Sequence, residues 1–395
     1  MGVVANGWAK KPLGKVCDIL DRLRKPITKR DRIPGPYPYY GATGVLDQVA
    51  DYIFDEPLVL IGEDGAKWEA GENSAFAIDG KTWVNNHAHV IRPHRDELRD
   101  DWLIYFLNAS DLMPFVSGMT VPKLNQGRLK EIPIPIPSPE EQRRIVTVLD
   151  EVFQGLDRAR AISQKNLADL KELYQSTLRR AFTGELTGDA EMSKWQNMRL
   201  IEIAVTKPNK KEARQQLSDD TLVSFVPMDC LNAGNRNLAS HETRPLSAVY
   251  KSYTYFGEGD VLLAKITPCF ENGKLGVARN LSNGIGFGSS EFFVIRSKGH
   301  VLADYIYYYF DQRSFRDSGK RVMTGAVGHK RVPRDFLETL SVPIPPLEDQ
   351  QRIVGILDSI FEELSLSRAQ VEANLANLAD LRQSLLQCAF AGELT

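Results

Sequence analysis

Acidic side chains gather in one stretch of the first third of the chain. The segment "EDGAKWEAGE" carries Glu63, Asp64, Lys67 and Glu72, and carboxylates of this kind hold the catalytic metal ions of many nucleases. Their spacing does not match two carboxylates and a lysine on one strand, and Gly65 marks a turn. We therefore predict no nuclease chemistry and no catalytic residue in this segment.

Two histidines follow in the segment "NNHAH". His87 and His89 alternate along an expected strand, so both would lie on one face, where two imidazoles can converge on a metal ion. No third histidine or cysteine stands at ligand spacing. Hydrogen-bonded structural histidines are favoured, and no metal site is predicted. The four cysteines are scattered singly, which indicates a reducing cytosol and argues against structural zinc.

Motifs for cofactor binding are absent from the sequence. The sequence has no Asn/Asp-Pro-Pro-aromatic motif, no Walker loop, and no glycine-rich loop that leads into a helix; "GIGFGSS" lacks the helix. We therefore predict that this chain binds no cofactor. A fused methyltransferase or nuclease is disfavoured for the same reason.

Basic stretches are the remaining candidates for a functional surface. They are "RLRKPITKRDR" (22–32), "GMTVPKLNQGRLK" (118–130) and "GKRVMTGAVGHKRVPR" (319–334). Lysine and arginine can neutralise DNA phosphates, while asparagine, glutamine and arginine can read base edges. The candidate DNA-contacting residues are Arg24, Lys25, Lys29, Arg30, Lys123, Asn125, Arg128, Lys320, Arg321, Lys330 and Arg331. A merely solvated basic face is the alternative, and the net charge of −2 does not decide between them.

A long internal repeat must position these stretches. "AFTGELT" ends at Thr187 and "AFAGELT" ends at Thr395, and a shift of 208 positions aligns 132–187 with 340–395 without a gap. In that alignment 28 of 56 positions are identical, which indicates duplication of a structural unit. The second and third basic stretches occupy equivalent places before the two copies, and this equivalence favours the DNA interpretation.

Each copy opens with alternating prolines, which allow an extended edge but not a central strand, and continues as a helix. Ser138, Pro139 and Glu141 are typical of a helix start, and Gly184 and Gly392 of left-handed stops. Each helix should run for about 40 residues, roughly 60 Å. The expected apolar seam contains Ile145, Leu149, Val152, Leu156, Leu170, Leu173, Ile353, Leu357, Ile360, Leu364, Leu378 and Leu385. The seam predicts an antiparallel coiled coil, with two ordinary core helices as the alternative.

The rest of the chain forms two heads rich in glycine, proline and aromatics. Runs such as "EPLVLIG", "TWVNNHAHVI", "DVLLAKI" and "SEFFVIRS" predict strands, and "RDDWLIYFLNAS" and "ADYIYYYFDQRSF" predict helices. We expect an α+β protein with mixed α/β heads at 1–131 and 188–339 and helical regions at 132–187 and 340–395. Trp8 and Trp195 stand eight residues after the start and after Thr187, so the repeat reads as a circular, pseudo-two-fold one.

This arrangement resembles the DNA specificity subunit of Type I restriction–modification systems. The resemblance covers the whole chain and is carried by "PIPIPSPEEQRRIV…LD…AFTGELT" with its copy "PIPPLEDQQRIVGILD…AFAGELT", by "YPYYGATGV…EDGA…NNHAHVIRP" and by "GDVLLAKITPCFENGK". Asp349 stands where the family has glutamate.

The resemblance implies a non-catalytic subunit whose two target-recognition domains each bind half of a bipartite, asymmetric site on double-stranded DNA. It implies that the paired helices set the spacing and dock two adenine-N6 methyltransferase subunits. S-adenosylmethionine, ATP and Mg²⁺ would then be bound only by the modification and restriction subunits.

Two further expectations concern alternatives and location. A coiled-coil protein scaffold that binds no DNA is the other function considered. The start of the chain lacks a signal-peptide pattern and no stretch of about 18 apolar residues occurs, so a cytoplasmic location without a membrane partner is expected.

Overall fold

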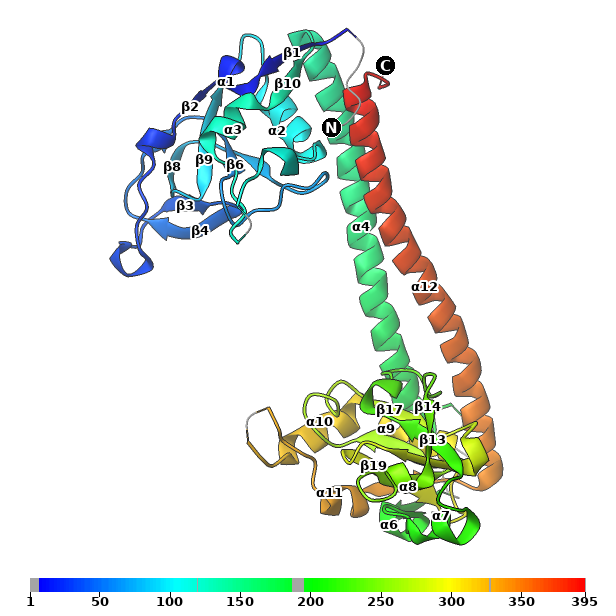
Figure 1. Cartoon of the computed structure of the whole chain (residues 1–395). Coiled ribbons are helices and arrows are strands. Elements are labelled where there is room, and N and C mark those ends of the chain that lie inside the picture. Colours follow the sequence, from blue (N-terminus) through cyan, green and yellow to red (C-terminus); the bar gives the residue numbers. More distant parts are fainter. Residues whose placement is uncertain (1–6, 119, 187–194, 327, 395) are drawn as a thin grey trace. The chain divides into compact units, whose positions relative to one another are not determined.

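The computed structural model of the protein describes residues 7–118, 120–186, 195–326 and 328–394. Thr187 and Thr395, the last residues of the two repeated tails, lie outside these ranges. The chain divides into two compact units, the first formed by residues 1–165 and 371–395 and the second by 166–370. Each unit therefore contains one head and part of each long helix (Figure 1).

The head of unit 1 is built from two four-stranded sheets and a two-stranded ribbon. The ribbon pairs β1 (Ala9–Pro12) antiparallel with the proline-rich β10 (Pro133–Ile136). One sheet has the order β2 (Cys17–Ile19), β9 (Ala88–Pro93), β6 (Leu58–Gly62), β7 (Ala75–Ile78); the other has the order β4 (Gly44–Val49), β3 (Tyr37–Gly41), β8 (Lys81–Val84), β5 (Phe54–Asp55). Its helices are α1 (Leu13–Val16), α2 (Asp100–Ala109) and α3 (Gln126–Glu131).

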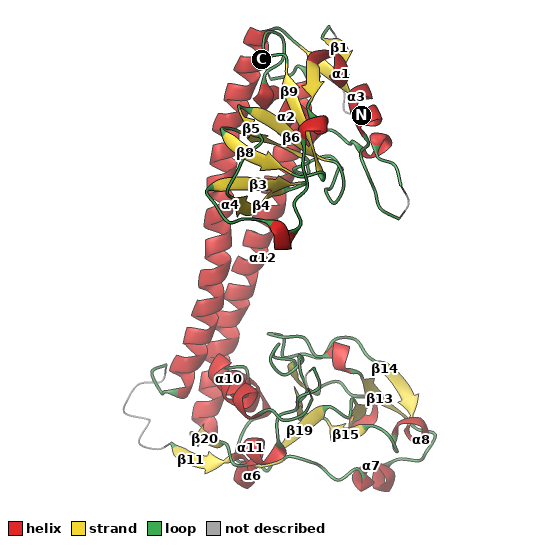
Figure 2. Ribbon diagram, turned by 90° about the vertical axis from the view of Figure 1, so that its left-hand side faces the viewer, coloured by secondary structure: helices red, strands yellow, loops and turns green. Residues whose placement is uncertain are grey.

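The head of unit 2 repeats this plan. Its ribbon pairs β11 (Gln196–Arg199) with β20 (Ser341–Ile344). One sheet has the order β12 (Ala204–Val205), β19 (Phe292–Ser297), β16 (Val261–Ala264), β17 (Leu275–Val277); the other has the order β14 (Glu242–Pro245), β13 (Leu222–Val226), β18 (Ile285–Gly288), β15 (Thr254–Gly257). Its helices are α6 (Leu200–Ile203), α7 (Lys211–Gln216), α8 (Leu246–Val249), α9 (Ala303–Phe310), α10 (Arg313–Val322) and α11 (Arg334–Glu338) (Figure 2).

The two heads share one strand order although their sequences diverge. Each of the eight sheet strands of unit 1 has a counterpart in unit 2, including the single parallel pairing in each second sheet, β3 with β8 and β13 with β18. The proline-rich strands lie in two-stranded ribbons. This is expected, because proline has no backbone N–H to donate and a strand with alternating prolines cannot form hydrogen bonds on both of its edges. The heads are therefore structural duplicates, which sequence similarity alone showed only near their ends.

The two long helices begin and end where the sequence predicts. Helix α4 spans Pro139–Phe182, 44 residues, and α12 spans Leu347–Ala391, 45 residues. The Ser138 Oγ accepts a hydrogen bond from the Glu141 amide at 3.2 Å, which is the expected N-cap. Gly184 and Gly392 adopt positive φ angles of 81° and 75°, so both left-handed stops are confirmed.

Within each unit the two helices run antiparallel and contact each other. In unit 1 the Arg382 guanidinium lies 4.1 Å from the Phe153 ring centre and 3.1 Å from Asp157. In unit 2 the rings of Tyr174 and Phe361 stack at 3.9 Å. Phe153 and Phe361 are equivalent in the repeat, so the same helix position meets the partner helix in both units.

The structure places the predicted seam residues at different depths. Ile145, Leu149, Ile353 and Leu357 are buried, and Leu156, Leu170, Ile360, Leu364, Leu378 and Leu385 are partly exposed. Val152 and Leu173 are 37% and 50% exposed, which corrects their assignment to the seam. The buried row passes instead from Leu149 to Phe153, because a straight helix repeats every 3.6 residues and drifts away from a strict 3.5-residue seam.

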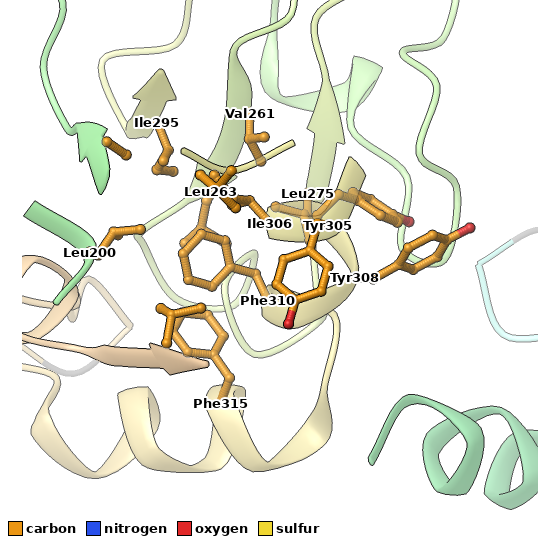
Figure 3. Close-up of a cluster of buried hydrophobic side chains, with 14 of the residues drawn as sticks. Leu200, Val261, Leu263, Leu275, Ile295, Tyr305, Ile306, Tyr308, Phe310 and Phe315 are labelled. Atoms are coloured by element: carbon orange, nitrogen blue, oxygen red, sulfur yellow. The ribbon is translucent and has the colours of Figure 1, made fainter. Parts of the chain in front are cut away.

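Each unit has a core that joins its head to the helices. In unit 1 the fully buried Trp102 of α2 packs beside Phe390 of α12. In unit 2 the buried Tyr305 of α9 contacts Phe182, the last residue of α4. Figure 3 shows the unit 2 cluster, in which side chains of α9 and α10 face those of the β16–β19 sheet. The helix ends are therefore part of the head cores.

Two expected elements are divided. "TWVNNHAHVI" forms two strands, β8 and β9, separated by a turn, and "ADYIYYYFDQRSF" forms α9 and the start of α10 with a break at Asp311 and Gln312. The first break places His87 in the turn rather than on a strand face. Among the residues that the structure describes, no helix is long and apolar enough to cross a membrane.

Candidate nucleic-acid interface

A short basic hairpin closes each head just before the proline-rich strand. In unit 1 its described residues are 117–118 and 120–123, here called hairpin 1, with paired backbone hydrogen bonds of 2.9 and 2.8 Å between Ser117 and Lys123. The amide of the next residue, Leu124, donates to the Glu63 carbonyl at 2.8 Å. Hairpin 1 is thereby attached to the end of β6, a strand inside its sheet.

Hairpin 2, whose described residues are 324–326 and 328–331, is attached in the same way in unit 2. Thr324 and Arg331 exchange backbone hydrogen bonds of 3.0 and 2.8 Å, and the Val332 amide donates to the Lys265 carbonyl at 2.9 Å. A further bond of 2.9 Å joins the Thr267 amide to the Lys330 carbonyl. The backbone therefore makes Glu63 equivalent to Lys265, and Lys123 equivalent to Arg331.

Glycine begins the turn of both hairpins. Gly118 has a φ angle of +96° and Gly325 one of +122°, in the region that favours glycine. A Cβ atom would stand 2.4 Å from the Val121 carbonyl oxygen in the first hairpin and 2.9 Å from that of His329 in the second. Both turns therefore require glycine.

A buried ionic cluster lies beneath hairpin 1. Glu63 contacts the Arg24 guanidinium at 2.5 Å and the Lys123 ammonium at 3.0 Å. Asp21 contacts His89 at 2.6 Å and accepts the Val90 amide at 2.9 Å. Burial raises the pKa values of both carboxyls, but these hydrogen bonds outweigh it and hold both pKa values below their usual range. Both carboxylates are therefore ionised at neutral pH.

His89 bridges two acceptor groups in this cluster. Its ring is fully buried, with Nδ1 2.6 Å from an Asp21 oxygen and Nε2 2.6 Å from the Leu124 carbonyl oxygen. A carbonyl and a carboxylate both accept hydrogen bonds, so each ring nitrogen faces an acceptor. His89 thus joins β9 to the base of hairpin 1.

The same cluster includes three side chains of the types that bind metals. Ligand atoms of Asp21, Glu63 and His89 all lie within 4.8 Å of one another. Their charges are already met by Arg24 and Lys123, which occupy the carboxylate oxygens that a metal would need. His87, expected on the same strand face, instead lies in the turn and pairs with Asp64 at 2.5 Å. Both histidines are thus hydrogen-bonded within the protein.

Positive charge is concentrated at the equivalent place in unit 2. Lys265 donates to the Ser290 carbonyl at 2.8 Å. Burial and the nearby cations Arg334, Arg331 and Lys207 lower the pKa of Lys265, and Glu291 only partly opposes them. Arg331 forms a two-bond contact with Glu291 at 2.8 and 3.0 Å. Four cations around one carboxylate form a site that attracts anions.

The predicted residues of the first basic stretch separate into two groups. Lys25, Lys29 and Arg30 are exposed, on the segment between η1 (Asp21–Leu23) and β3 that includes η2 (Lys29–Asp31). Arg24 is instead largely buried and donates to Glu63 and, at 2.7 Å, to the Ala88 carbonyl. This corrects its assignment as a DNA contact, because its guanidinium is occupied by acceptors that lie far away in the sequence.

The other predicted residues surround the hairpins. Lys123, Lys330 and Arg331 belong to the hairpins, and Lys320 and Arg321 are exposed in the last turn of α10. The side-chain Nδ2 of Asn125 donates to Ser117 Oγ at 2.7 Å, so Asn125 stabilises hairpin 1. Arg128 forms an exposed pair with Glu131 at 3.1 Å on α3.

Lys207, Lys265 and Arg334 were missed by reasoning from the sequence. Arg334 ends the third basic stretch, whereas Lys207 and Lys265 lie outside all three stretches. Folding brings the three cations together. One sequence signal for Glu63 and Lys265 was available. The two strand runs "EPLVLIG" and "DVLLAKI" are similar and both lead into glycine-containing turns; Glu63 follows the first run and Lys265 lies near the end of the second.

Comparison with known proteins agrees with this geometry. The family described as "Type I restriction modification DNA specificity domain" matches residues 5–167 and again 192–375. A putative type I restriction enzyme specificity subunit of Haemophilus influenzae, S.HindORF215P, is 27% identical over 360 residues, 90% of this chain and 88% of that protein. The EcoEI specificity subunit of Escherichia coli is 35% identical over 198 residues, 50% of this chain and 32% of that protein.

Solved structures show the same fold. A chain from a study of complex assembly and conformational transition of the type I R-M system superposes with a TM-score of 0.72 at 19% identity and covers 99% of both chains. The HsdS subunit of Thermoanaerobacter tengcongensis gives 0.54 at 20% identity, over 99% of this chain and 98% of that one.

These findings favour DNA recognition over a scaffold that binds no DNA. The family matches twice, once over each head and the helical region that follows it, in register with the internal repeat. The chain belongs to the DNA specificity subunits of type I restriction–modification systems.

Proposed function

We propose that each head of this subunit binds one half of a bipartite, asymmetric DNA site, with its basic hairpin against the DNA. Family membership gives the chain its role in DNA recognition, with catalysis in partner subunits. The observation that carries the proposal is that two heads of one topology present hairpins with the same backbone attachment, each flanked by exposed cations.

The two heads should recognise different half-sites. The equivalent positions Glu63 and Lys265 carry opposite charges, and Asp64 in unit 1 corresponds to the apolar Ile266 in unit 2. Glu63 is buried and neutralises Arg24 and Lys123, whereas Lys265 adds positive charge beside Arg331. The two hairpins therefore present different charge to the base edges and phosphates of DNA. An asymmetric site follows from these differences.

The remaining parts of the proposal concern the partners. We propose that the helix pair sets the distance between the half-sites and docks two adenine-N6 methyltransferase subunits, and that restriction subunits join this complex. S-adenosylmethionine, ATP and Mg²⁺ are then bound by those subunits, and the assembly works in the cytoplasm. The repeat of α4 in α12 supports this stoichiometry, because it offers two similar helix surfaces.

The direct test removes two cations from hairpin 2. Lys330→Ala with Arg331→Ala should weaken DNA binding by the full chain and reduce the slope of log affinity against log salt by between about one and two, since each lost phosphate contact lowers it by about one. The lower value applies if Arg331 keeps its contact with Glu291 in the complex. Fluorescence anisotropy with a duplex carrying the site found by methylome sequencing measures both quantities.

A matched control removes the same charge elsewhere in unit 2. Lys211→Ala with Lys251→Ala changes exposed lysines on α7 and after α8, and it should leave the salt slope unchanged. If the two double variants changed the affinity and the salt slope equally, hairpin 2 would be a solvated basic surface and not a DNA contact. A loss limited to the base preference of one half-site would assign hairpin 2 to base reading.

A further inference from the structure

The glutamine in each copy of the helix-start motif is completely buried. Gln142 in "EEQRRI" and Gln350 in "EDQQRI" both have no exposed surface, although each lies in the first turn of a long helix. A buried amide must be hydrogen-bonded, since an unpaired one costs free energy. The partners of these two side chains therefore show why glutamine stands there.

Gln142 connects the head of unit 1 to α4. Its Oε1 accepts the Arg99 amide at 2.9 Å, and its Nε2 donates to the Glu97 carbonyl at 2.7 Å and to the Pro137 carbonyl at 3.0 Å. Glu97 and Arg99 precede α2, whereas Pro137 precedes α4. One side chain thus holds the start of a head helix against the start of the long helix.

Gln350 makes the same three bonds in unit 2. Its Oε1 accepts the Leu302 amide at 2.8 Å, and its Nε2 donates to the carbonyls of His300 at 3.0 Å and Pro345 at 2.9 Å. The partners His300 and Leu302 differ in type from Glu97 and Arg99, but all the bonds use backbone groups. The geometry is therefore the same in both heads whatever side chains the heads carry.

Two more contacts repeat around each glutamine. The Trp102 Nε1 donates to the Pro135 carbonyl at 2.9 Å, and the Tyr305 hydroxyl donates to that of Pro343 at 2.8 Å. On the next helical turn, Tyr105 donates to Asp150 of α4. Tyr308 donates to Asp358 of α12 in the same way. We call these contacts, with the glutamine bonds, joint 1 in unit 1 and joint 2 in unit 2.

Joint 2 has an additional ionic brace. The Arg236 guanidinium donates to both oxygens of Asp358 at 2.8 and 3.1 Å, lies 3.2 Å from Asp304 and stands over the Tyr308 ring at 5.6 Å. No arginine forms a comparable contact with Asp150 in the described part of unit 1. Joint 1 thus depends more heavily on its glutamine.

We propose that Gln142 and Gln350 are positioning residues that fix each head on its long helix and thereby restrict recognition to one spacing between half-sites. The proposal rests on the proposed function of the heads. Each joint uses backbone groups outside hairpins 1 and 2, so a weakened joint leaves half-site recognition intact. It frees the head to tilt, so that half-sites at neighbouring spacings are accepted.

The test compares binding to duplexes that carry both half-sites with spacers from two base pairs shorter to two longer than the native one. Gln350→Met removes the three bonds at nearly equal volume, and Gln351→Met places the same substitution on the exposed neighbour as a control. Wild-type affinity should fall about tenfold or more for one base pair of spacer error, comparable to one mismatched pair. For Gln350→Met the fall should be about threefold or less, with unchanged affinity for a single half-site.

Gln142→Met should relax spacing more than Gln350→Met, because joint 1 lacks the arginine brace. Tyr105→Phe and Tyr308→Phe delete only one hydroxyl each, so they provide milder variants if a methionine variant folds poorly. They should relax spacing in the same direction, and more for Tyr105→Phe.

Unchanged spacing discrimination in the methionine and phenylalanine variants would overturn the proposal. It would also be overturned if half-site affinity and spacing discrimination fell together, since the glutamines would then serve only the stability of the heads. Failure of the wild-type chain to bind any half-site would instead refute the proposed function, so the two failures are distinguishable.

Discussion

The ionic cluster beneath hairpin 1 makes a quantitative prediction. His89→Phe replaces a buried imidazole with the residue type found at the equivalent position of unit 2, Phe293, so the ring itself can be accommodated. The substitution removes both bonds of the imidazole and leaves the Leu124 carbonyl without its donor. Removal of one partner from a buried ion pair costs about 3–5 kcal/mol.

The lower end of that range applies here. Asp21 keeps the Val90 amide at 2.9 Å, the Gln126 side chain at 3.1 Å and the Arg24 guanidinium at 3.4 Å. We therefore expect a loss of about 3 kcal/mol in the free energy of unfolding of unit 1. With a urea m-value of about 2 kcal/mol per M, the unfolding midpoint should fall by about 1.5 M.

Tryptophan fluorescence during urea unfolding measures this loss in the right unit. Four of the five tryptophans, Trp8, Trp68, Trp83 and Trp102, belong to unit 1. His87→Phe is the matched control, because His87 also contacts a carboxylate but its side chain is 50% exposed. An exposed ion pair contributes about 1 kcal/mol or less. Equal midpoint shifts for the two variants would refute the claim that His89 holds a buried ionic cluster together.

Three further predictions follow from the same structure. The pKa values of Asp21 and Glu63 are lowered in the folded protein. Their contribution to stability is therefore complete above the pKa values of the unfolded chain, near pH 4, and is lost as the pH falls through the folded pKa values. When the urea midpoint is measured against pH, it should depend less on pH in His89→Phe than in wild type. Four residues inserted after Lys165 and four after Gln370, where the two units divide, lengthen both long helices by about 6 Å. Methylome sequencing should then show unchanged half-sites and a spacer one to two base pairs longer. An unchanged spacer with full activity would show that the helix pair does not set the spacing. An insertion near Gly184 would not serve this purpose, because α4 is already packed into the unit 2 core at Phe182. Light scattering of the complex with its methyltransferase should give two copies per chain, and a saturated one-to-one complex would contradict this.

The helices were the most predictable part of the fold. Their caps, stops and length depend on local residues such as Ser138 and Gly184, and the repeat supplied two readings of one pattern. The seam was less predictable, because Val152 and Phe153 are adjacent apolar residues and only the true helical period decides which is buried. The common topology of the heads was hidden, since backbone pairing of strands tolerates almost any set of apolar side chains.

The site was predictable in position but not in detail. The equivalence of hairpins 1 and 2 follows from their equal distance to the repeated proline-rich segment, which can be recognised in the sequence. The burial of Arg24 does not, because Glu63 and Ala88 approach it only after the sheets form. Gln142 stood in a recognisable motif, yet its partners are backbone groups about forty residues away, and backbone groups leave no sequence signal.

The attachment of the two hairpins has a consequence for how recognition can change. The Leu124 amide donates to the Glu63 carbonyl and the Val332 amide to the Lys265 carbonyl, at 2.8 and 2.9 Å, so the main chain attaches both hairpins in the same way. In unit 1 the Glu63 side chain adds contacts with Arg24 and Lys123. An acid and a base have been accepted at one scaffold position. Point substitutions at Lys265 can therefore explore new half-sites while hairpin 2 keeps its backbone attachment. A change at Glu63 must also supply a new partner for the buried Arg24, so the unit 2 strand end is the natural starting point for redesigning specificity one residue at a time.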